Sequence, residues 1–191
     1  LFLNGQALMQ DVVAPNKVDK NFLERTLEEL TSKAVQHIHE YKIDSLQFPR
    51  SIKPDDTPHT TNSRSWTSGF YPGTLWQLYA YSKNEKVKQA AQQWTSFVEK
   101  EKYDRHTHDL GFKLNCSHGQ AYEITQEPHH KEVVVTASET LIKRYNPVVG
   151  AIRSWDHNQE KWDYPVIIDN MMNLEMLFEA TEFTGDSTYY D

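Results

Sequence analysis

The chain has 191 residues, with 20 Lys and Arg against 27 Asp and Glu, and a formal net charge of −7. This length predicts one domain, and no apolar run approaches the roughly 20 residues that a membrane-spanning helix needs. The charge is uneven, because residues 101–191 hold eight basic and 16 acidic side chains. We therefore expect neither a membrane nor a nucleic-acid partner, since nucleic-acid affinity comes largely from basic contacts to phosphate.

Metal-ligating residue types are present but fall in no recognisable metal pattern. Cys116 is the only cysteine, which excludes an intrachain disulfide and a cysteine-based zinc site. The pair His129-His130 and the spacing His106-x-His108 match no zinc motif. We predict no metal and no other cofactor.

Apolar residues recur at helical spacing through most of the chain. An amphipathic helix is predicted from Asp19 to about Tyr41, and a polar loop with three prolines follows from Asp44 to Ser68. Further helices are expected after Pro72-Gly73, over about 87–98, 118–125 and 133–145, and from Asn170 to Thr184. Helices that alternate with irregular loops indicate an all-α fold of stacked helical hairpins.

The two ends of the chain carry separate predictions. The apolar stretch Leu1–Met9 could be the tail of a secretory signal, so residues 1–18 are predicted to be an N-terminal extension. That suggests a periplasmic protein, with the cytoplasm as the alternative. Gly185–Asp191 resembles the start of another helix, with a cap at Asp186. A helical array that ends there lacks a capping element, so we predict that residues 19–191 are the N-terminal part of a larger catalytic domain.

The segment 164–173, YPVIIDNMMN, delivers Asp169 to the start of a predicted helix. Apolar surroundings favour the protonated form of a carboxyl group, whereas a helix N-terminus favours the charged form. A carboxyl balanced between these effects suits general acid/base catalysis. The simpler interpretation is that Asp169 only caps the helix through its side chain.

Three other loop clusters join Asp169 as candidates for a site: 65–73 (SWTSGFYPG), 108–112 (HDLGF) and 150–156 (GAIRSWD). Aromatic rings beside carboxylates suit a sugar site, because rings stack on sugar faces and acids bind hydroxyls. Each candidate also has a structural interpretation. Trp66 and Trp155 could be core anchors, Asp109 could close a turn through its own backbone, and His108 could be a hydrogen-bond partner.

Four runs in this order resemble the unsaturated glucuronyl hydrolases of glycoside hydrolase family 88: SWTSGFYPGTLWQLY, HDLGF with CSHG, TLIKRYNPVVGAIRSWD and YPVIIDNMMNLEMLFEATEFTGD. The resemblance extends from about Trp66 to Gly185 and implies an (α/α)6 barrel, of which this chain would supply about half. It implies hydrolysis of glycosaminoglycan-type oligosaccharides left by polysaccharide lyases, which carry a 4,5-unsaturated uronic acid at the non-reducing end. Such enzymes remove that sugar by hydrating its C4=C5 bond.

The resemblance also implies roles for individual residues. Asp169 would protonate C4 and then activate water, while Asp109 would hold ring hydroxyls and favour a protonated Asp169. Trp66 and Trp155 would form walls of the subsite, and His108 would orient Asp109. Contacts to the uronate carboxylate and to the leaving sugar would come from the missing C-terminal half of the barrel.

Two alternatives remain open from the sequence. The same barrel could serve an unsaturated rhamnogalacturonyl hydrolase, or an inverting glycosidase that uses Asp109 and Asp169 as an acid and base pair. A non-catalytic, carbohydrate-binding helical protein is the alternative from another class. The sequence does not specify the preferred oligosaccharide, its sulfation or its linkage.

Overall fold

The computed structural model describes residues 19–40 and 43–190. The predicted N-terminal extension, and with it the possible signal remnant, lies outside this part of the chain. None of the helices within it has the length and apolar character needed to cross a membrane.

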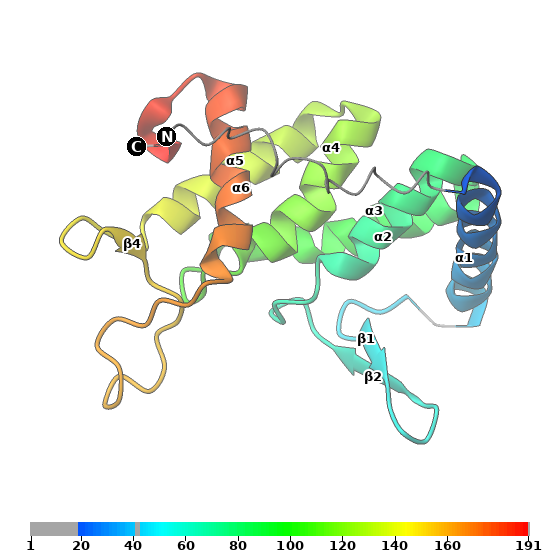
Figure 1. The fold of residues 1–191 in the computed structure, drawn as a ribbon, viewed down its shortest axis with the longest axis horizontal. Helices are drawn as coiled ribbons and strands as arrows, with labels where there is room; N and C mark the ends of the chain where they lie inside the picture. Colours follow the sequence, from blue (N-terminus) through cyan, green and yellow to red (C-terminus); the bar gives the residue numbers. More distant parts are fainter. Residues whose placement is uncertain (1–18, 41–42, 191) are drawn as a thin grey trace, which may run out of the picture.

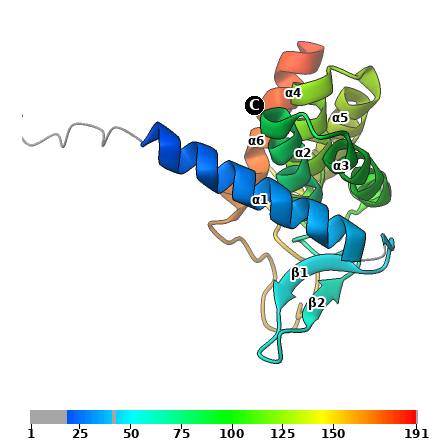
Figure 2. The same ribbon diagram turned by 90° about the vertical axis from the view of Figure 1, so that its right-hand side faces the viewer.

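Helices make up most of the described chain (Figures 1 and 2). The α-helices are α1 (Lys20–Glu40), α2 (Phe70–Ser82), α3 (Glu85–Val98), α4 (Gln120–Thr125), α5 (Pro128–Ile142) and α6 (Asn170–Thr184). The other helical segments are the 3-10 helices η1 (Glu99–Tyr103) and η3 (Ser187–Tyr189) and the π-helix η2 (Gly111–Gly119). Two short antiparallel hairpins pair β1 (Phe48–Ile52) with β2 (Pro58–Thr61) and β3 (Tyr145–Asn146) with β4 (Ala151–Ile152).

The helices form an open array with α1 at one end and α6 at the other (Figure 1). Helix α2 packs against α3, η2 contacts both α2 and α5, and α5 contacts α6. The loops that precede α2 and α6 lie on one side of this array, at the bottom of Figure 1, together with the β1–β2 hairpin. The predicted arrangement of helical hairpins is therefore present, and it places the candidate loops on a common side.

Two tryptophans anchor the core where α2 packs on α3. Trp76 is fully buried and its indole Nε1 donates a hydrogen bond of 2.9 Å to Oγ1 of Thr95. Trp94 is 2% exposed and meets the ring of Phe48 edge-on at 4.8 Å. The contact between Phe48 and Trp94 attaches the β1–β2 hairpin to the helices, so the core continues beneath the loops.

The predicted polar loop from Asp44 to Ser68 was wrong, because it contains the β1–β2 hairpin. Its prolines suggested a loop, but proline is accepted at the first residue of a strand or beside a bulge. Pro58 begins β2, and Pro49 lies next to the irregularity in β1. The turn places Asp56 at φ 62°, which Asp tolerates better than most residues.

Several helix boundaries also differ from the prediction. Helix α2 begins at Phe70 and includes Pro72 in its first turn, where a missing N–H costs no hydrogen bond. The helix expected near His118 begins earlier, at Gly111, as a π-helix. Helix α5 ends at Ile142, whereas Tyr145 lies in β3. The cap at Asp186 is confirmed, since its carboxylate accepts from the N–H of Thr188 at 2.9 Å.

Helix α6 leaves part of its apolar surface uncovered. Met172 and Phe178 are 63% and 50% exposed. Leu177 is buried, and Asn173 and Met176 are fully buried. The exposed face adjoins a largely apolar hollow of about 670 Å³ whose lining includes Ile167, Ile168 and Met171. The apolar pattern therefore marks both sides of the helix, and only one side is covered by the described chain.

Candidate active site

Asp169 lies at the N-cap position of α6 and does not act as a side-chain cap. Its backbone is helical, with φ −65° and ψ −11°, and its side chain makes no capping hydrogen bond. The carboxylate Oδ1 is buried without a partner among the described residues. The capping interpretation was therefore wrong, and the carboxylate is available for another role.

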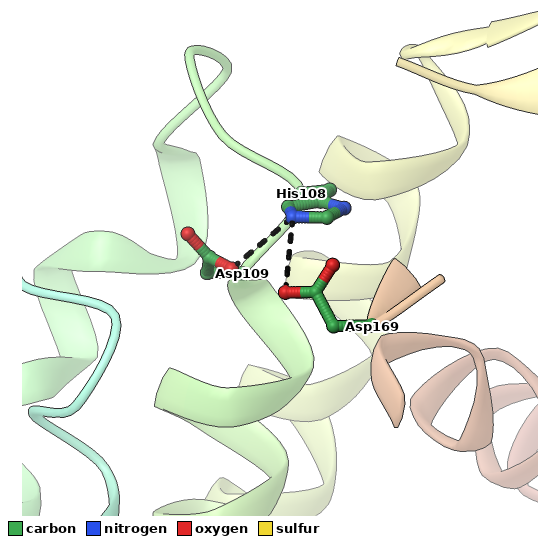
Figure 3. A group of neighbouring side chains, drawn as sticks. All are labelled: His108, Asp109 and Asp169. Atoms are coloured by element: carbon green, nitrogen blue, oxygen red, sulfur yellow. Dashed lines mark ion pairs between the residues drawn. The ribbon is translucent and has the colours of Figure 1, made fainter. Parts of the chain in front are cut away.

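His108 connects the two candidate aspartates (Figure 3). Its Nε2 lies 3.3 Å from Oδ1 of Asp109 and 3.8 Å from Oδ2 of Asp169. The imidazole is 3% exposed, whereas the side chains of Asp109 and Asp169 are 20% and 40% exposed. A buried imidazole thus faces two carboxylates that remain accessible to a ligand.

Asp109 is oriented by the residues just before it. The hydroxyl of Thr107 donates a 2.5 Å hydrogen bond to Oδ2 of Asp109 and accepts one of 3.1 Å from the backbone N–H of the same residue. The turn is therefore closed by the threonine hydroxyl and not by the aspartate carboxylate. This leaves Oδ1 of Asp109 directed at His108.

Ser154 holds together the two loops that carry the aspartates, and it was not singled out within the candidate cluster 150–156. Its carbonyl accepts from the N–H of His108 at 3.0 Å, and its Oγ accepts from the N–H of Ile167 at 3.1 Å. Its own N–H donates to the carbonyl of Pro165 at 2.8 Å. Because Ser154 is fully buried, these bonds are shielded from water and fix one loop relative to the other.

Asn173 connects the helices that follow the aspartates. Its Oδ1 accepts from the N–H of Phe112 at 2.9 Å, and its Nδ2 donates to the carbonyl of Asp169 at 3.4 Å. A Cβ at Gly111 would lie 2.6 Å from Cα of Asn173, so only glycine allows η2 to approach α6 this closely.

The two candidate tryptophans contact different neighbours. Trp66 is 45% exposed and packs edge-on to Phe70 and at a tilt to Phe112, both at 5.7 Å. Trp155 pairs through its backbone with Thr107, and its ring stacks on His157 at 5.4 Å. Neither tryptophan belongs to the buried core, so the core-anchor interpretation does not apply to them.

The donor atoms of His108, Asp109 and Asp169 all lie within 4.8 Å of one another, close enough to share a cation. Our expectation of no metal stays a prediction. The histidines of the pair His129-His130 and His106 have other partners. His129 contacts Glu99 at 3.0 Å, and His106 lies 3.5 Å from Asp156.

Comparison with known proteins gives consistent relatives, although no family model matches the chain. An unsaturated glucuronyl hydrolase of Formosa agariphila is 44% identical over 160 residues, which cover 82% of this chain and 40% of that protein. An unsaturated chondroitin disaccharide hydrolase of Streptococcus pyogenes is 33% identical over 147 residues, 75% of this chain and 37% of that protein.

A solved structure agrees with these sequences. The crystal structure of an unsaturated glucuronyl hydrolase specific for heparin has a TM-score of 0.83 and 36% identity, over 90% of this chain and 45% of that one. Such neighbours are (α/α)6 barrels, so the predicted partial barrel is confirmed. The chain spans less than half the length of these relatives. Within that span, the chain belongs to the unsaturated glucuronyl hydrolase family.

Proposed function

We propose that this site removes a 4,5-unsaturated uronic acid from the non-reducing end of lyase-generated oligosaccharides. The observation that carries the proposal is the placement of Asp109 and Asp169 around the buried ring of His108. One carboxyl group can then exchange a proton with the substrate while the other stays fixed. The family relationship supplies the reaction, and the geometry is compatible with it.

The reaction needs a proton donor that later becomes a base. The C4=C5 bond is conjugated with the ring oxygen as a vinyl ether. Transfer of the Asp169 proton to C4 leaves an oxocarbenium-like cation at C5, and the resulting carboxylate takes a proton from the water that adds there. Opening of the hemiketal breaks the bond between C5 and the ring oxygen and leaves a hemiacetal at C1. The linked sugar is released when this hemiacetal collapses to an aldehyde and the C1–O bond to that sugar breaks.

The other residues of the site would position the substrate. Asp109, held by Thr107, would bind ring hydroxyls. His108 would keep Asp109 oriented from beneath the site. The exposed ring of Trp66 and the ring of Trp155 would form the walls, because aromatic rings pack on the apolar faces of sugars.

The names of the relatives suggest the substrate class. One is called a chondroitin disaccharide hydrolase and another is described as specific for heparin. We therefore favour unsaturated disaccharides of the glycosaminoglycan type. Since the relatives are more than twice as long as the matched span, we expect the isolated chain to turn over substrate weakly or not at all.

The spacing of the carboxylates disfavours an inverting glycosidase. Facing oxygens of Asp109 and Asp169 lie within 4.8 Å, whereas inverting pairs are separated by roughly 6.5–9.5 Å to admit water. A rhamnogalacturonyl hydrolase would share the site and differ in substrate. A non-catalytic binding protein would have no need of an unpaired carboxylate oxygen at Asp169.

The test joins residues 19–191 to the complementary part of the Formosa agariphila relative. The chimera is incubated with unsaturated disaccharides from chondroitin, hyaluronan and heparin while the ultraviolet absorbance of the double bond is followed. We expect absorbance to fall, Asp169→Asn to abolish the fall, and Asp163→Asn to leave it intact. Asp163 is a matched control because it is an exposed aspartate in the same loop.

Each other result has a defined meaning. Cleavage of saturated glycosides with no loss of absorbance would move the protein to the glycosidase alternative. A folded chimera, verified by circular dichroism, that binds the disaccharides without turning them over would support the binding-protein alternative. Equal activity of the Asp169→Asn and Asp163→Asn variants would remove Asp169 from the mechanism.

A further inference from the structure

A second hollow, of about 530 Å³, lies beside the candidate active site and is rich in cations. Four basic side chains line it, namely Arg105, Lys143, Arg144 and Arg153, together with the single carboxylate Asp156. Residues 101–191 contain eight Lys and Arg and 16 Asp and Glu. Half of the cations and one of the acids therefore gather here, which gives a local formal charge of +3 in an acidic region.

The carboxylate of Asp156 already forms an ion pair with an arginine in this hollow. Its two oxygens lie 3.0 and 3.1 Å from the terminal nitrogens of Arg144. Although burial alone would raise the pKa of Asp156, the guanidinium groups of Arg144 and Arg153 hold it below its usual range. The one local carboxylate thus stays charged and is shared by Arg144 and Arg153, so Arg105 and Lys143 have no acid of their own among the described residues.

Arg153 is held in a fixed orientation. Its Nε donates to the carbonyl of Trp155 at 3.0 Å and lies 3.4 Å from Asp156. Its guanidinium lies over the ring of Tyr164 at 5.8 Å, and Tyr164 is itself anchored by a 2.6 Å hydrogen bond to the carbonyl of Arg144. A guanidinium fixed in advance loses little conformational entropy when it binds an anion.

Arg105 and Lys143 complete the hollow with exposed side chains. No carboxylate of the described residues forms an ion pair with either of them. Guanidinium groups bind tetrahedral oxyanions through paired hydrogen bonds, and a lysine adds a mobile positive charge. The chemistry of the hollow therefore fits a group such as a sulfate.

The hollow and the active site are built from the same two chain segments. Arg105 precedes His108 by three residues, a distance of at most about 11 Å along an extended chain. Arg153 precedes Trp155 by two residues, and Thr107 pairs with Trp155 between the segments. An oligosaccharide in the active site is thus within reach of the hollow.

We propose that this hollow is a binding site for a sulfate ester carried by the oligosaccharide. The proposal rests on the proposed function for the identity of the saccharide, while the preference for an oxyanion rests on the cations alone. With such a site, sulfation of the oligosaccharide would raise its affinity for this part of the protein. None of the proposed catalytic residues contributes a side chain to the hollow.

The test measures binding of unsaturated chondroitin disaccharides, with and without a sulfate ester, to the 191-residue chain by calorimetry at low ionic strength. We expect the sulfated form to bind more tightly. The double substitution Arg105→Gln with Lys143→Gln should weaken it about tenfold, as expected for the loss of two charge-assisted contacts. Affinity for the unsulfated form should change less than twofold.

A matched control has the same change in net charge. Arg25→Gln with Lys86→Gln removes one exposed arginine and one exposed lysine far along the chain from the hollow, and it should leave both affinities unchanged. Equal affinities for the two disaccharides in the unmodified chain, or equal effects of the two double variants, would overturn the proposal. So would inorganic sulfate binding as tightly as the sulfated disaccharide, since the hollow would then be a general anion site.

The outcome is separate from that of the proposed reaction. Asp169→Asn should keep the discrimination between the sulfated and unsulfated forms, because Asp169 does not line the hollow. Loss of turnover in the chimera without loss of this discrimination would contradict the reaction alone. Turnover by the chimera, combined with equal affinities for the sulfated and unsulfated disaccharides, would contradict the sulfate site alone.

Discussion

The amide oxygen of Asn173 accepts a hydrogen bond of 2.9 Å from the backbone N–H of Phe112, 61 residues earlier in the chain. This contact joins the first turn of α6 to the first turn of the π-helix η2. Asp169 directly precedes one of these helices, and Asp109 lies two residues before the other. The separation of the two proposed catalytic carboxylates is therefore set by an amide that never touches the substrate site.

Removal of this amide should destabilise the protein. In the Asn173→Ala variant, the half-buried N–H of Phe112 loses its acceptor, and an unsatisfied group shielded from water costs up to about 1–3 kcal/mol. Urea unfolding monitored by circular dichroism measures the change. Asn21→Ala is the control, since its exposed side chain lies on α1 and such substitutions usually stay within about 0.5 kcal/mol. Equal effects of the two variants would show that the contact contributes little.

The close approach of η2 and α6 predicts an unusual cost for an added methyl group. A Cβ at Gly111 would meet Cα of Asn173 at 2.6 Å and has no flexible neighbour to displace. Gly111→Ala should therefore lower the free energy of unfolding by about 1–3 kcal/mol or more, as overpacking does.

Gly150 provides the comparison for this substitution. It has φ +72°, and no atom lies within 4 Å of the point that an added Cβ would occupy, so Gly150→Ala should cost only the backbone strain of about 1–2 kcal/mol. Thermal or urea unfolding of both variants ranks the two effects. A smaller loss for Gly111→Ala than for Gly150→Ala would mean that η2 can shift away from α6.

The elements that could be predicted from the sequence are those whose signal is local. Helix α3 shows its apolar face and its Asn84 cap in consecutive residues, and α6 ends at Gly185 with φ +74°. The β1–β2 hairpin was missed because Pro49 and Pro58 suppress the usual strand signal. Both prolines are tolerated only because of where they fall in the pairing.

In the candidate site too, the residues with a local motif could be predicted and the contacts between distant segments could not. His108, Asp109 and Asp169 were identified from motifs, through the family resemblance, but their mutual distances depend on contacts between distant segments. Ser154 and Asn173 establish those contacts through hydrogen bonds to backbone groups. A serine before a tryptophan or an asparagine in a helix has no local pattern that reveals such a partner.

A buried histidine pair predicts acid sensitivity of the fold. Nδ1 of His118 lies 2.9 Å from Nδ1 of His130, and burial together with His130 lowers the pKa of His118 to about 3. The unfolded chain has an ordinary histidine pKa of about 6.5, so it binds a proton more readily than the folded state. Stability is therefore full above about pH 6.5 and falls as the pH drops toward 3.

The expected size of this effect follows from linkage. Between pH 7 and pH 5, the free energy of unfolding should fall by about 2 kcal/mol through His118 alone. Glu99 has its pKa lowered to about 2 by Lys102 and His129 against the opposing effect of burial, so its contribution is lost only at lower pH. Urea unfolding at the two pH values measures the slope, which His118→Gln should reduce and the exposed control His39→Gln should not. An equal slope in both variants would assign the acid sensitivity to other groups.

Cys116 should be unreactive in the folded protein. Burial, with Glu175 and Glu179 nearby, raises the pKa of its thiol to about 11. At pH 8 the thiolate fraction is then on the order of one in a thousand, whereas an ordinary cysteine with a pKa near 8.5 is about one-quarter ionised. Alkylation by iodoacetamide, followed by mass spectrometry, should therefore be at least about a hundredfold slower than for glutathione.

In urea the thiol should react at the ordinary rate, because the burial that suppresses ionisation is lost. Rapid alkylation without urea would show that the contact between η2 and α2 opens readily, since Gly73 packs on the carbonyl of Cys116 at that contact.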